Sequence, residues 1–516
     1  MIGQAAHAQQ GGAGAGAQPA GNGGAPRDPW RFQPALSVDE TYSDNITLAA
    51  KGQERSDLVT TISPSLRVTR YGPWLTFSSS YTPQLLYYAR GSYGSTIRNY
   101  LDATASVTAV QNLLFFDARA AITQQNISPF GTQAAGTVNG SSNTAETRSF
   151  SLGPTLRSRF GNDLSYSLAY QYAASSSGSD AYNSNHTSTL IGQFESGTSF
   201  RNLGYNASVS RVDQDYGGLN GEIITEQFNN GLTYVLTPTI RAHTNIGYDH
   251  NRYPTSGAAD LKGVSYSAGA DWNPSQHTAL SVLLGHRYFG PTANVTFSRS
   301  TPRTSITVSY TRDQTTNSSS GLALVPNQNY LIFDSLLRDQ FPDPILRAQA
   351  VQQLLAQQGL STSPYGVGGF ASAQLYVQKS LQASIGLNGL RNNVSLTAYR
   401  TDSQSLSAVQ TDFDAFNQAN KFRQTGYSLN WGHKLGPRTN ASASFTKTRS
   451  VALIGAGDSR QRAIQVSINR QIQPRLSGTV SVRNTVQDAS NGNVQGNFYN
   501  GNYRENQILG SLHLTF

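Results

Sequence analysis

The chain has 516 residues, of which 37% are hydrophobic and only 13% charged, and its formal net charge is +9; soluble domains carry about 25% charged residues. No stretch approaches the roughly 20 consecutive apolar residues of a transmembrane helix, so a membrane protein of this composition must be a closed β-barrel. The absence of cysteine excludes disulfides, thiolate chemistry, iron–sulfur clusters and covalently bound c-type haem.

Residues 1–29 are expected to be a signal-peptide remnant and a disordered periplasmic leader. Ala6-His7-Ala8 has the small-x-small form of a signal-peptidase site, but the charged and apolar regions that should precede it are missing. The following residues are rich in Gly, Ala, Gln and Pro, a composition that cannot bury enough apolar surface to fold. The barrel is therefore expected to span residues 30–516.

From Trp30 onward, apolar and polar residues alternate along most of the chain. In residues 164–171, Leu and Tyr alternate with Ser, Ala and Gln, and residues 305–310 and 464–469 repeat the pattern. A membrane strand needs this alternation because one face meets lipid and the other a polar lumen. A sandwich core would give the same alternation, but not over nearly the whole chain without a second type of element.

Short turns alternate with longer Gly/Ser/Asn-rich stretches. Outer-membrane barrels place short turns in the periplasm and long loops outside, so ten turns plus a first and a last strand predict an all-β, antiparallel barrel of about 22 strands, within a range of 20 to 24. The turns lie at 71–73, 110–112, 160–162, 195–197, 236–238, 273–275, 301–303, 389–391, 435–437 and 472–474. The longer stretches cover 43–56, 126–145, 174–186, 212–222, 405–420 and 486–502.

The long loop at residues 315–370 is predicted to contain a helix. Asp343 suits the N-cap, Pro344 the first helical position, and Gly359 the C-terminal stop. Turn counting places this loop outside the cell, and a barrel of this size has a lumen that needs a plug or an in-folded loop. We expect a cap or constriction, the alternative being a partner-binding helix. The apolar face of this helix is Leu346, Val351, Leu354 and Leu355.

The last ten residues form an alternating strand that ends on an aromatic residue. An alternating last strand ending in Phe is similar to the C-terminal signal by which bacterial outer-membrane proteins are recognised for assembly. An ordinary half-buried strand at the end of a soluble domain is the alternative. The lipid-facing members are Ile508, Leu512, Leu514 and Phe516.

Three stretches of the chain resemble a known family: residues 39–46 (DETYSDNI), 56–64 (SDLVTTISP) and 124–131 (QQNISPFG). They are similar to the outer-membrane proteins associated with PEP-CTERM/exosortase systems, which are encoded beside exopolysaccharide biosynthesis genes in Gram-negative bacteria. The resemblance covers residues 32–516 and is strongest near the start of that span. It implies a barrel of the bacterial outer membrane that moves exopolysaccharide to the cell surface, and it brings no catalytic motif.

No enzymatic, metal or cofactor site is predicted. None of the eight His residues has a neighbouring acid and nucleophile in a recognisable motif, so we interpret them as lumen or rim residues. The best acidic spacing is Asp213-Gln214-Asp215 with Glu222. An EF-hand loop needs further ligands where Gly217 and Ile224 stand here, so a polar surface loop is expected.

Strand parity directs several charged residues into the lumen. This placement follows whatever the function, because a charge facing lipid at mid-bilayer costs about 2–4 kcal/mol. One interpretation is a satisfied wall with Arg–Asp pairs such as Asp117 and Arg119; the other is a mildly cationic path for an anionic polymer, since Arg binds carboxylates and phosphates bidentately. The lumen candidates are Arg67, Arg119, Arg157, Arg159, Arg241, Arg287, Arg483 and Asp117, with Asp39, Asp102, Asp249 and Asp271.

The leading functional prediction is an outer-membrane channel for exopolysaccharide export through a polar lumen, with direction supplied by inner-membrane synthesis and periplasmic export components. The alternatives are a general or solute-selective diffusion porin and a structural or surface-binding barrel. Expected partners are outer-membrane lipid, lipopolysaccharide, the barrel assembly machinery and the polysaccharide, and not nucleic acid, because no basic cluster or recognition helix appears. Tyr87, Tyr88, Tyr166 and Tyr170 are expected either in the aromatic girdle or stacking on sugars.

Overall fold

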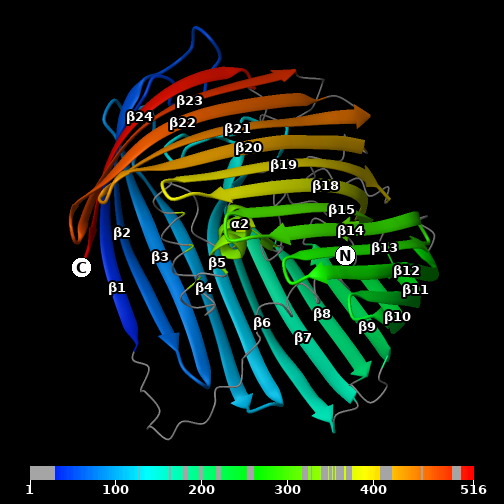
Figure 1. Cartoon of the computed structure of the whole chain (residues 1–516). Coiled ribbons are helices and arrows are strands. Elements are labelled where there is room, and N and C mark those ends of the chain that lie inside the picture. Colours follow the sequence, from blue (N-terminus) through cyan, green and yellow to red (C-terminus); the bar gives the residue numbers. More distant parts are fainter. Residues whose placement is uncertain are drawn as a thin grey trace, which may run out of the picture.

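A computed structural model shows how the strands are arranged (Figure 1). The structure describes residues 30–126, 128–161, 164–177, 184–196, 202–216, 222–252, 261–316, 324–326, 328–338, 347, 351, 355, 365–367, 375–406, 421–454, 457–490 and 501–516. The predicted leader at residues 1–29 lies outside this part of the chain, and so does part of each of several long loops.

A 22-stranded antiparallel sheet forms the wall of the barrel. Strands that follow each other in sequence are neighbours in the sheet, and β1 closes the barrel by pairing with β24 from Ala35↔Thr515 to Ser43↔Gln507. The strands of this sheet are β1 Arg31–Ser43, β2 Asp57–Tyr71, β3 Leu75–Tyr88, β4 Thr96–Val110, β5 Leu114–Asn126, β6 Thr144–Phe160, β7 Leu164–Ser177, β8 Asn185–Ser196, β9 Leu203–Tyr216, β10 Glu222–Thr237, β11 Ile240–Arg252, β12 Leu261–Ser275, β13 Thr278–Arg287, β14 Gly290–Ser300, β15 Thr304–Thr316, β18 Leu375–Asn388, β19 Asn392–Ser405, β20 Lys421–Gly436, β21 Thr439–Ile454, β22 Asp458–Gln473, β23 Leu476–Ser490 and β24 Tyr503–Thr515.

Three further described elements lie between β15 and β18 in the chain. They are the helix α2 (Gln328–Leu337) and the short strands β16 (Leu324–Pro326) and β17 (Tyr365–Val367), which pair with each other outside the main sheet. Among the residues that the structure describes, no helix combines the length and the apolar character needed to cross a membrane.

The two faces of the wall differ as the alternation predicts. On β22, Ile464, Val466 and Ile468 point outward and are 48%, 51% and 50% exposed, whereas Ser467 between them is buried on the inner face. A closed barrel has no free strand edge, so its wall can stand in lipid without unpaired backbone groups. An outer face covered by exposed apolar side chains is stable only in such surroundings. The chain is therefore a β-barrel of the bacterial outer membrane, and the predicted fold class is confirmed.

A junction between two paired strands lies at or within three residues of each of the ten predicted short turns; the largest difference is at 273–275, which ends β12 just before the junction. The long stretches fall at the opposite end of the barrel, which the rule for outer-membrane barrels makes extracellular. The connection from β13 to β14 at that end is very short: it consists of Tyr288 and Phe289 alone, and Gly290 follows with φ +112°. These two strands have only 10 and 11 residues, whereas β6 has 17, so the wall is lowest there.

Candidate functional site

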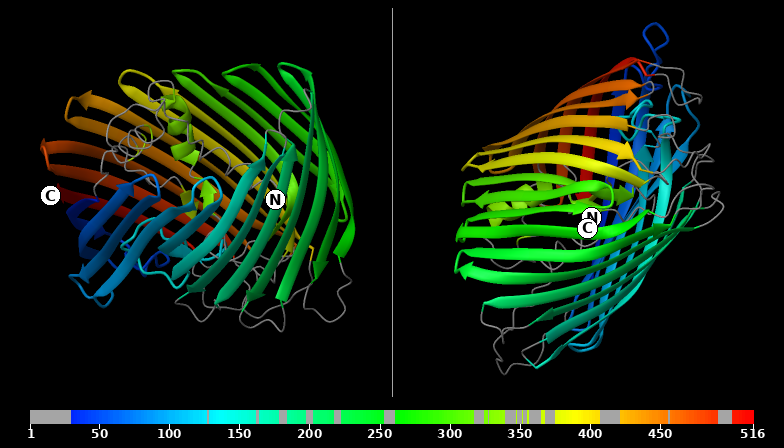
Figure 2. Two further views of the ribbon diagram at one scale, coloured as in Figure 1. Left: turned by 90° about the horizontal axis from the view of Figure 1, so that it is seen from below. Right: turned by 90° about the vertical axis from the view of Figure 1, so that its right-hand side faces the viewer.

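The first element inserted into the lumen is α2, which lies inside the ring of strands against β15, β18 and β19 (Figure 2). Gly386 on β18 lies beneath Ile332 and Leu336, and a Cβ atom at this position would collide with both side chains. The missing side chain at Gly386 therefore allows the helix to approach the wall closely.

Polar side chains of the inner wall fix the position of α2 along the barrel axis. Ser335 donates to Ser305 Oγ at 2.5 Å, and Ser300 donates to the carbonyl of Ser335 at 3.1 Å. Ser395 on β19 donates to Asn329 Oδ1 at 3.1 Å. Ser300, Ser305 and Ser395 all lie beside short turns, so α2 sits deep in the lumen, near the periplasmic end.

The helix predicted for the long loop is seen at a few described positions. Val351 and Leu355 are helical and fully buried, as expected of its apolar face. Arg347 is also helical, and its Nε lies 2.7 Å from Asp334 Oδ1 on α2. The core that they join consists of Tyr330, Ile332, Phe333, Leu336 and Leu337. The other predicted helix residues, Asp343, Pro344, Leu346 and Leu354, lie outside the described part of the chain.

The helix α2 itself was not predicted. Its sequence, QNYLIFDSLL, has no Gly or Pro just past its end, and such punctuation was the signal used for the helix that was predicted. The available signal was the apolar run from Tyr330 to Phe333 with Leu336 and Leu337, which repeats at helical spacing. The loop that leaves the extracellular end thus places a helix inside the lumen (Figure 2), as the hypothesis of a constriction requires.

The second inserted element is the connection between β5 and β6, whose described residues 128–143 we term the β5–β6 segment. Val138 is buried against Ile46, Leu86 and Tyr88 on one side of the barrel. Phe130 is buried in a cluster with Tyr376 on β18 and Phe422 on β20 on the other side. The two anchors of one short segment therefore lie on distant parts of the wall.

The start of the β5–β6 segment shows that the chain crosses the opening. Asn126 ends β5, and Phe130, four residues later, is buried beside Phe422 on β20. From β5 through β1 and β24 to β20, the wall takes about nine strand-to-strand steps of about 4.8 Å, or about 43 Å. Four residues reach about 14 Å when fully extended, so the chain takes a chord across the extracellular end of the lumen.

Inward side chains of β22, β23 and β24 bind the backbone of this segment. Gln487 accepts from the amide of Gln133 at 2.9 Å and donates to the carbonyl of Gly131 at 3.0 Å. Gln461 and Tyr503 donate to the carbonyl of Gln133 at 2.7 and 2.5 Å. The buried backbone groups of a non-regular segment need such partners, so the wall is built to hold this segment.

A buried polar cluster holds the other half of the segment, and we term Ser43, Asn139, Glu505 and Gln507 the latch. Oε1 of Glu505 accepts from Asn139 at 2.5 Å, from Ser43 at 2.6 Å and from Gln507 at 2.6 Å. Gln507 also donates to Asn139 Oδ1 at 3.1 Å. All four side chains are at most 5% exposed, and a carboxylate in this setting binds its donors strongly.

Tyrosines beneath the segment add further contacts. Tyr88 donates to the carbonyl of Val138 at 2.8 Å, and Tyr93, between β3 and β4, donates to the carbonyl of Gly140 at 3.1 Å. Burial raises the pKa of Tyr93, so its hydroxyl remains a donor throughout the physiological range. Tyr88 faces inward, whereas Tyr87 and Tyr170 are 60% and 43% exposed on the lipid face, where an aromatic girdle belongs.

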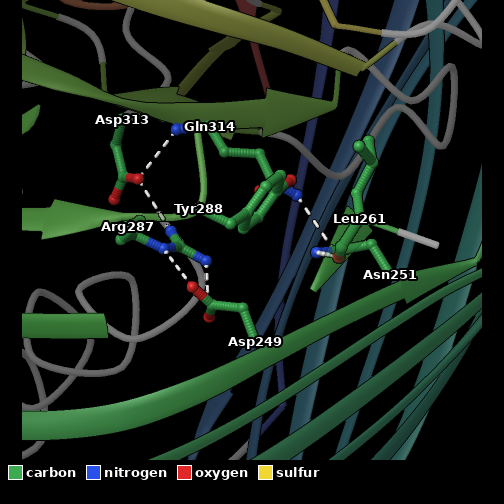
Figure 3. Close-up of polar contacts among 7 residues, drawn as sticks. All are labelled: Asp249, Asn251, Leu261, Arg287, Tyr288, Asp313 and Gln314. Atoms are coloured by element: carbon green, nitrogen blue, oxygen red, sulfur yellow. Dashed lines mark hydrogen bonds and ion pairs between the residues drawn. The ribbon is translucent and has the colours of Figure 1, made fainter. Parts of the chain in front are cut away.

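Arg287 forms an ion-pair cluster on the lumen wall (Figure 3). Its Nε and Nη2 lie 2.8 and 2.9 Å from the two oxygens of Asp249 on β11, and its Nη1 lies 2.7 Å from Asp313 on β15. Gly263 is opposite Asp249 on the intervening strand β12, and it has no side chain that would separate Asp249 from Arg287. Arg287 therefore ties together strands on both sides of the short β13–β14 hairpin and is not a free cation of the path.

Other predicted lumen arginines lie beside acids or beside the β5–β6 segment. Arg119 lies 3.2 Å from Asp102 across the β4–β5 pair, and Arg241 is directly opposite Asp271 in the β11–β12 register. Arg483 donates to the carbonyl of Ala135 at 2.7 Å and to Gln507, so it anchors the β5–β6 segment. The remaining predicted lumen residues, on the inner faces of β2, β5 and β6 near short turns, are Arg67, Asp117, Arg157 and Arg159.

Two of these, Arg157 and Arg159, lie together on β6 at the periplasmic end. The guanidinium carbon of Arg157 lies 4.0 Å from the ring centroid of Phe115, an arrangement that orients the cation and leaves its edge available to an acceptor. Their register partners on β7 are Ser167 and Ser165. The inner wall thus presents an uncharged polar strand beside two adjacent cations at the periplasmic mouth.

The histidines lie on both faces of the wall. His513 faces inward, with its Nδ1 2.8 Å from Ser37 Oγ, and His243 faces inward with its Nδ1 3.8 Å from Asp271. His286 and His433 stack on the outward rings of Tyr266 and Trp431 near the strand ends. Asp213, part of the weak acidic spacing, binds Nε of Arg211 at 3.0 Å.

Similarity to solved structures extends along most of the chain at low sequence identity. The siderophore receptor PirA from Acinetobacter baumannii matches with a TM-score of 0.46 and 8% identity over 94% of this chain and 80% of that one. PirA from Pseudomonas aeruginosa matches with a TM-score of 0.38 and 12% identity over 95% of this chain and 81% of that one. OpdO from Pseudomonas aeruginosa matches with a TM-score of 0.31 and 11% identity over 94% of this chain and 97% of that one. No protein-family model matches the chain, and no curated protein does.

Proposed function

We propose that this barrel is an outer-membrane channel that exports an exopolysaccharide carrying acidic groups. The observation that carries the proposal is the pair Arg157 and Arg159 at the periplasmic mouth, with Arg157 oriented by Phe115. A polymer leaving the periplasm meets this mouth first. Guanidinium groups bind carboxylates bidentately, and the neighbouring serines Ser165 and Ser167 suit sugar hydroxyls.

The inserted elements supply the control that a polymer channel needs. The β5–β6 segment crosses the extracellular end, and α2 narrows the lumen near the other end. A closed resting lumen protects the cell from leakage, and a moving polymer displaces the segment by competing for its hydrogen bonds. Directionality comes from synthesis at the inner membrane and from periplasmic export components.

The test compares surface and periplasmic polysaccharide in a strain that lacks this gene and carries complementing alleles. The wild-type allele is expected to restore surface polymer, whereas the double variant Arg157→Gln/Arg159→Gln is expected to leave several-fold more polymer in the periplasm. The matched control is Arg438→Gln/Arg475→Gln, which removes two exposed cations from periplasmic turns on other strands. Normal surface polymer in the strain without this gene would overturn the proposal.

A diffusion porin is the main competing function, because the Arg119–Asp102 pair and the Arg287 cluster resemble a satisfied polar wall. A porin conducts constitutively and passes small solutes, whereas the proposed exporter has low resting conductance and binds its polymer. A structural barrel does neither. Single-channel recordings of the purified protein, with and without the extracted polysaccharide, therefore separate the three functions.

A further inference from the structure

The outer face of the wall carries a cationic patch near the extracellular end of β21 and β22. On β22, Arg460 and Arg462 are exposed and continue the lipid-facing row that includes Ile464. On β21, Lys447 and Arg449 are exposed on the same outer face. Since β22 begins at Asp458 on the loop side, these cations lie just above the apolar band, at the level of the outer leaflet.

The register sets like charges directly opposite each other in this patch. Lys447 pairs with Arg462, and Arg449 pairs with Arg460. Side chains directly opposite in an antiparallel pair have Cβ atoms about 4.5–5.5 Å apart, and like charges in this position destabilise the sheet. The repulsion within two consecutive cation–cation pairs on one face must therefore be offset by negative groups that lie outside the pairs.

Acidic neighbours compensate only one of the two pairs. Asp458 lies 2.8 Å from both Arg449 and Arg460 and bridges that pair. Within the part of the chain that the structure describes, neither Lys447 nor Arg462 forms an ion pair. The other charged residues near the extracellular end of this outer face on β18–β23 are Lys379, Arg400, Asp402, Lys421, Arg423 and Asp488. Asp402 binds Arg400 and Arg423, and Asp488 is opposite Arg460.

The uncompensated pair lies at the border between the apolar band and water. Tyr427 on β20 is directly opposite Lys447, its ring is in reach of the ammonium group at 5.9 Å, and the residue is 46% exposed. Outward aromatic residues mark the interface level of a membrane barrel. Leu429 and Ile464 continue the face toward the membrane centre and offer a surface for acyl chains.

We propose that Lys447 and Arg462 bind a phosphate of lipopolysaccharide, the phosphorylated glycolipid of the outer leaflet. A phosphate between the two cations offsets the repulsion that arises because Lys447 and Arg462 are directly opposite each other. Arg462 would donate two hydrogen bonds to the phosphate, and Lys447 would act as a point charge. The glycolipid is favoured over free phosphate because its acyl chains lie on the apolar surface directly below. The proposal concerns the outer face and is independent of what crosses the lumen.

The binding test uses the purified full-length barrel in detergent and titrates it with diphosphoryl lipid A, with fully dephosphorylated lipid A and with inorganic phosphate, counting bound molecules by native mass spectrometry. Wild type is expected to prefer diphosphoryl lipid A by about tenfold over the dephosphorylated form. Lys447→Gln/Arg462→Gln is expected to lose that preference. The control Arg148→Gln/Lys262→Gln removes two exposed cations on β6 and β12 and should keep it.

A second measurement distinguishes lipid binding from a general effect of charge. In detergent without lipid, removing the repelling pair is expected to raise the Tm of Lys447→Gln/Arg462→Gln above wild type, and diphosphoryl lipid A should reverse that order. Equal binding of dephosphorylated lipid A, or equal affinity in the double variant, would overturn the proposal. Strong binding of inorganic phosphate alone would overturn its assignment to the glycolipid.

Discussion

Asn139 and Glu505 are 366 positions apart in the chain, yet the side-chain amide of Asn139 donates to Oε1 of Glu505 at 2.5 Å. This bond joins the β5–β6 segment to the last strand of the barrel, and both residues are almost completely buried. We therefore expect the fixed segment to close the channel at rest and its release to open the channel.

The latch is expected to control conductance. Asn139→Ala removes the donor to Glu505 and the acceptor of Gln507, a loss of about 1–3 kcal/mol in holding the segment. We expect a higher single-channel conductance or more frequent opening in planar bilayers. The control Asn484→Ala makes the same truncation on β23, where Asn484 binds Asn506 at 2.7 Å on the exposed face. Identical traces for wild type and Asn139→Ala would show that the segment does not gate the lumen.

The constriction that we propose at α2 is expected to respond to a change in the wall beneath the helix. Gly386→Val places methyl groups where Ile332 and Leu336 now lie, so α2 should leave the wall and the conductance should change. Deletion of residues 325–362 should raise the conductance above that of wild type. Gly510→Val is the control, because a Cβ at this site of β24 meets no other atom within 4 Å. Unaltered conductance after the deletion would argue against any occlusion by this insertion.

The Arg287 cluster is expected to stabilise the low part of the wall. Arg287→Gln leaves the buried carboxylate of Asp249 without its cation and removes one partner of Asp313, and breaking such a buried arrangement costs about 3–5 kcal/mol. We expect a clearly lower Tm in detergent. The triple variant Arg287→Gln/Asp249→Asn/Asp313→Asn should recover much of this loss, because no buried charge remains. A triple variant as unstable as the single one would contradict this account.

The C-terminal residue is expected to act in assembly and not in stability. Phe516 is 64% exposed, and its backbone amide donates to the carbonyl of Pro34 at 3.0 Å, a bond that does not need its ring. Phe516→Ala should therefore reduce the folded barrel in the outer membrane several-fold, while the purified variant refolds in detergent like wild type. Thr515→Ala is the control. Equal membrane levels of all three proteins would disprove the assembly role.

The barrel could be predicted from sequence because the residue patterns that specify its strands and turns are local. Alternation with period two defines the two faces of each strand, and Gly, Pro and Asn mark the turns. Counting ten turns was therefore sufficient for 22 strands, and the parity of residues such as Arg287 and Arg483 placed them inside. The helical character of Val351 and Leu355 followed in the same way from spacing and punctuation.

Only the tertiary structure decided how the lumen is filled and which charges remain for a ligand. Arg287 and Arg483 were predicted as lining residues, but the one is held by Asp249 and Asp313 and the other binds Ala135 and Gln507. Strand parity specifies a direction, whereas a partner depends on the register between strands and on where a loop returns. The chord of the β5–β6 segment and the latch join residues hundreds of positions apart, and no local pattern encodes a contact whose geometry exists only after the barrel closes.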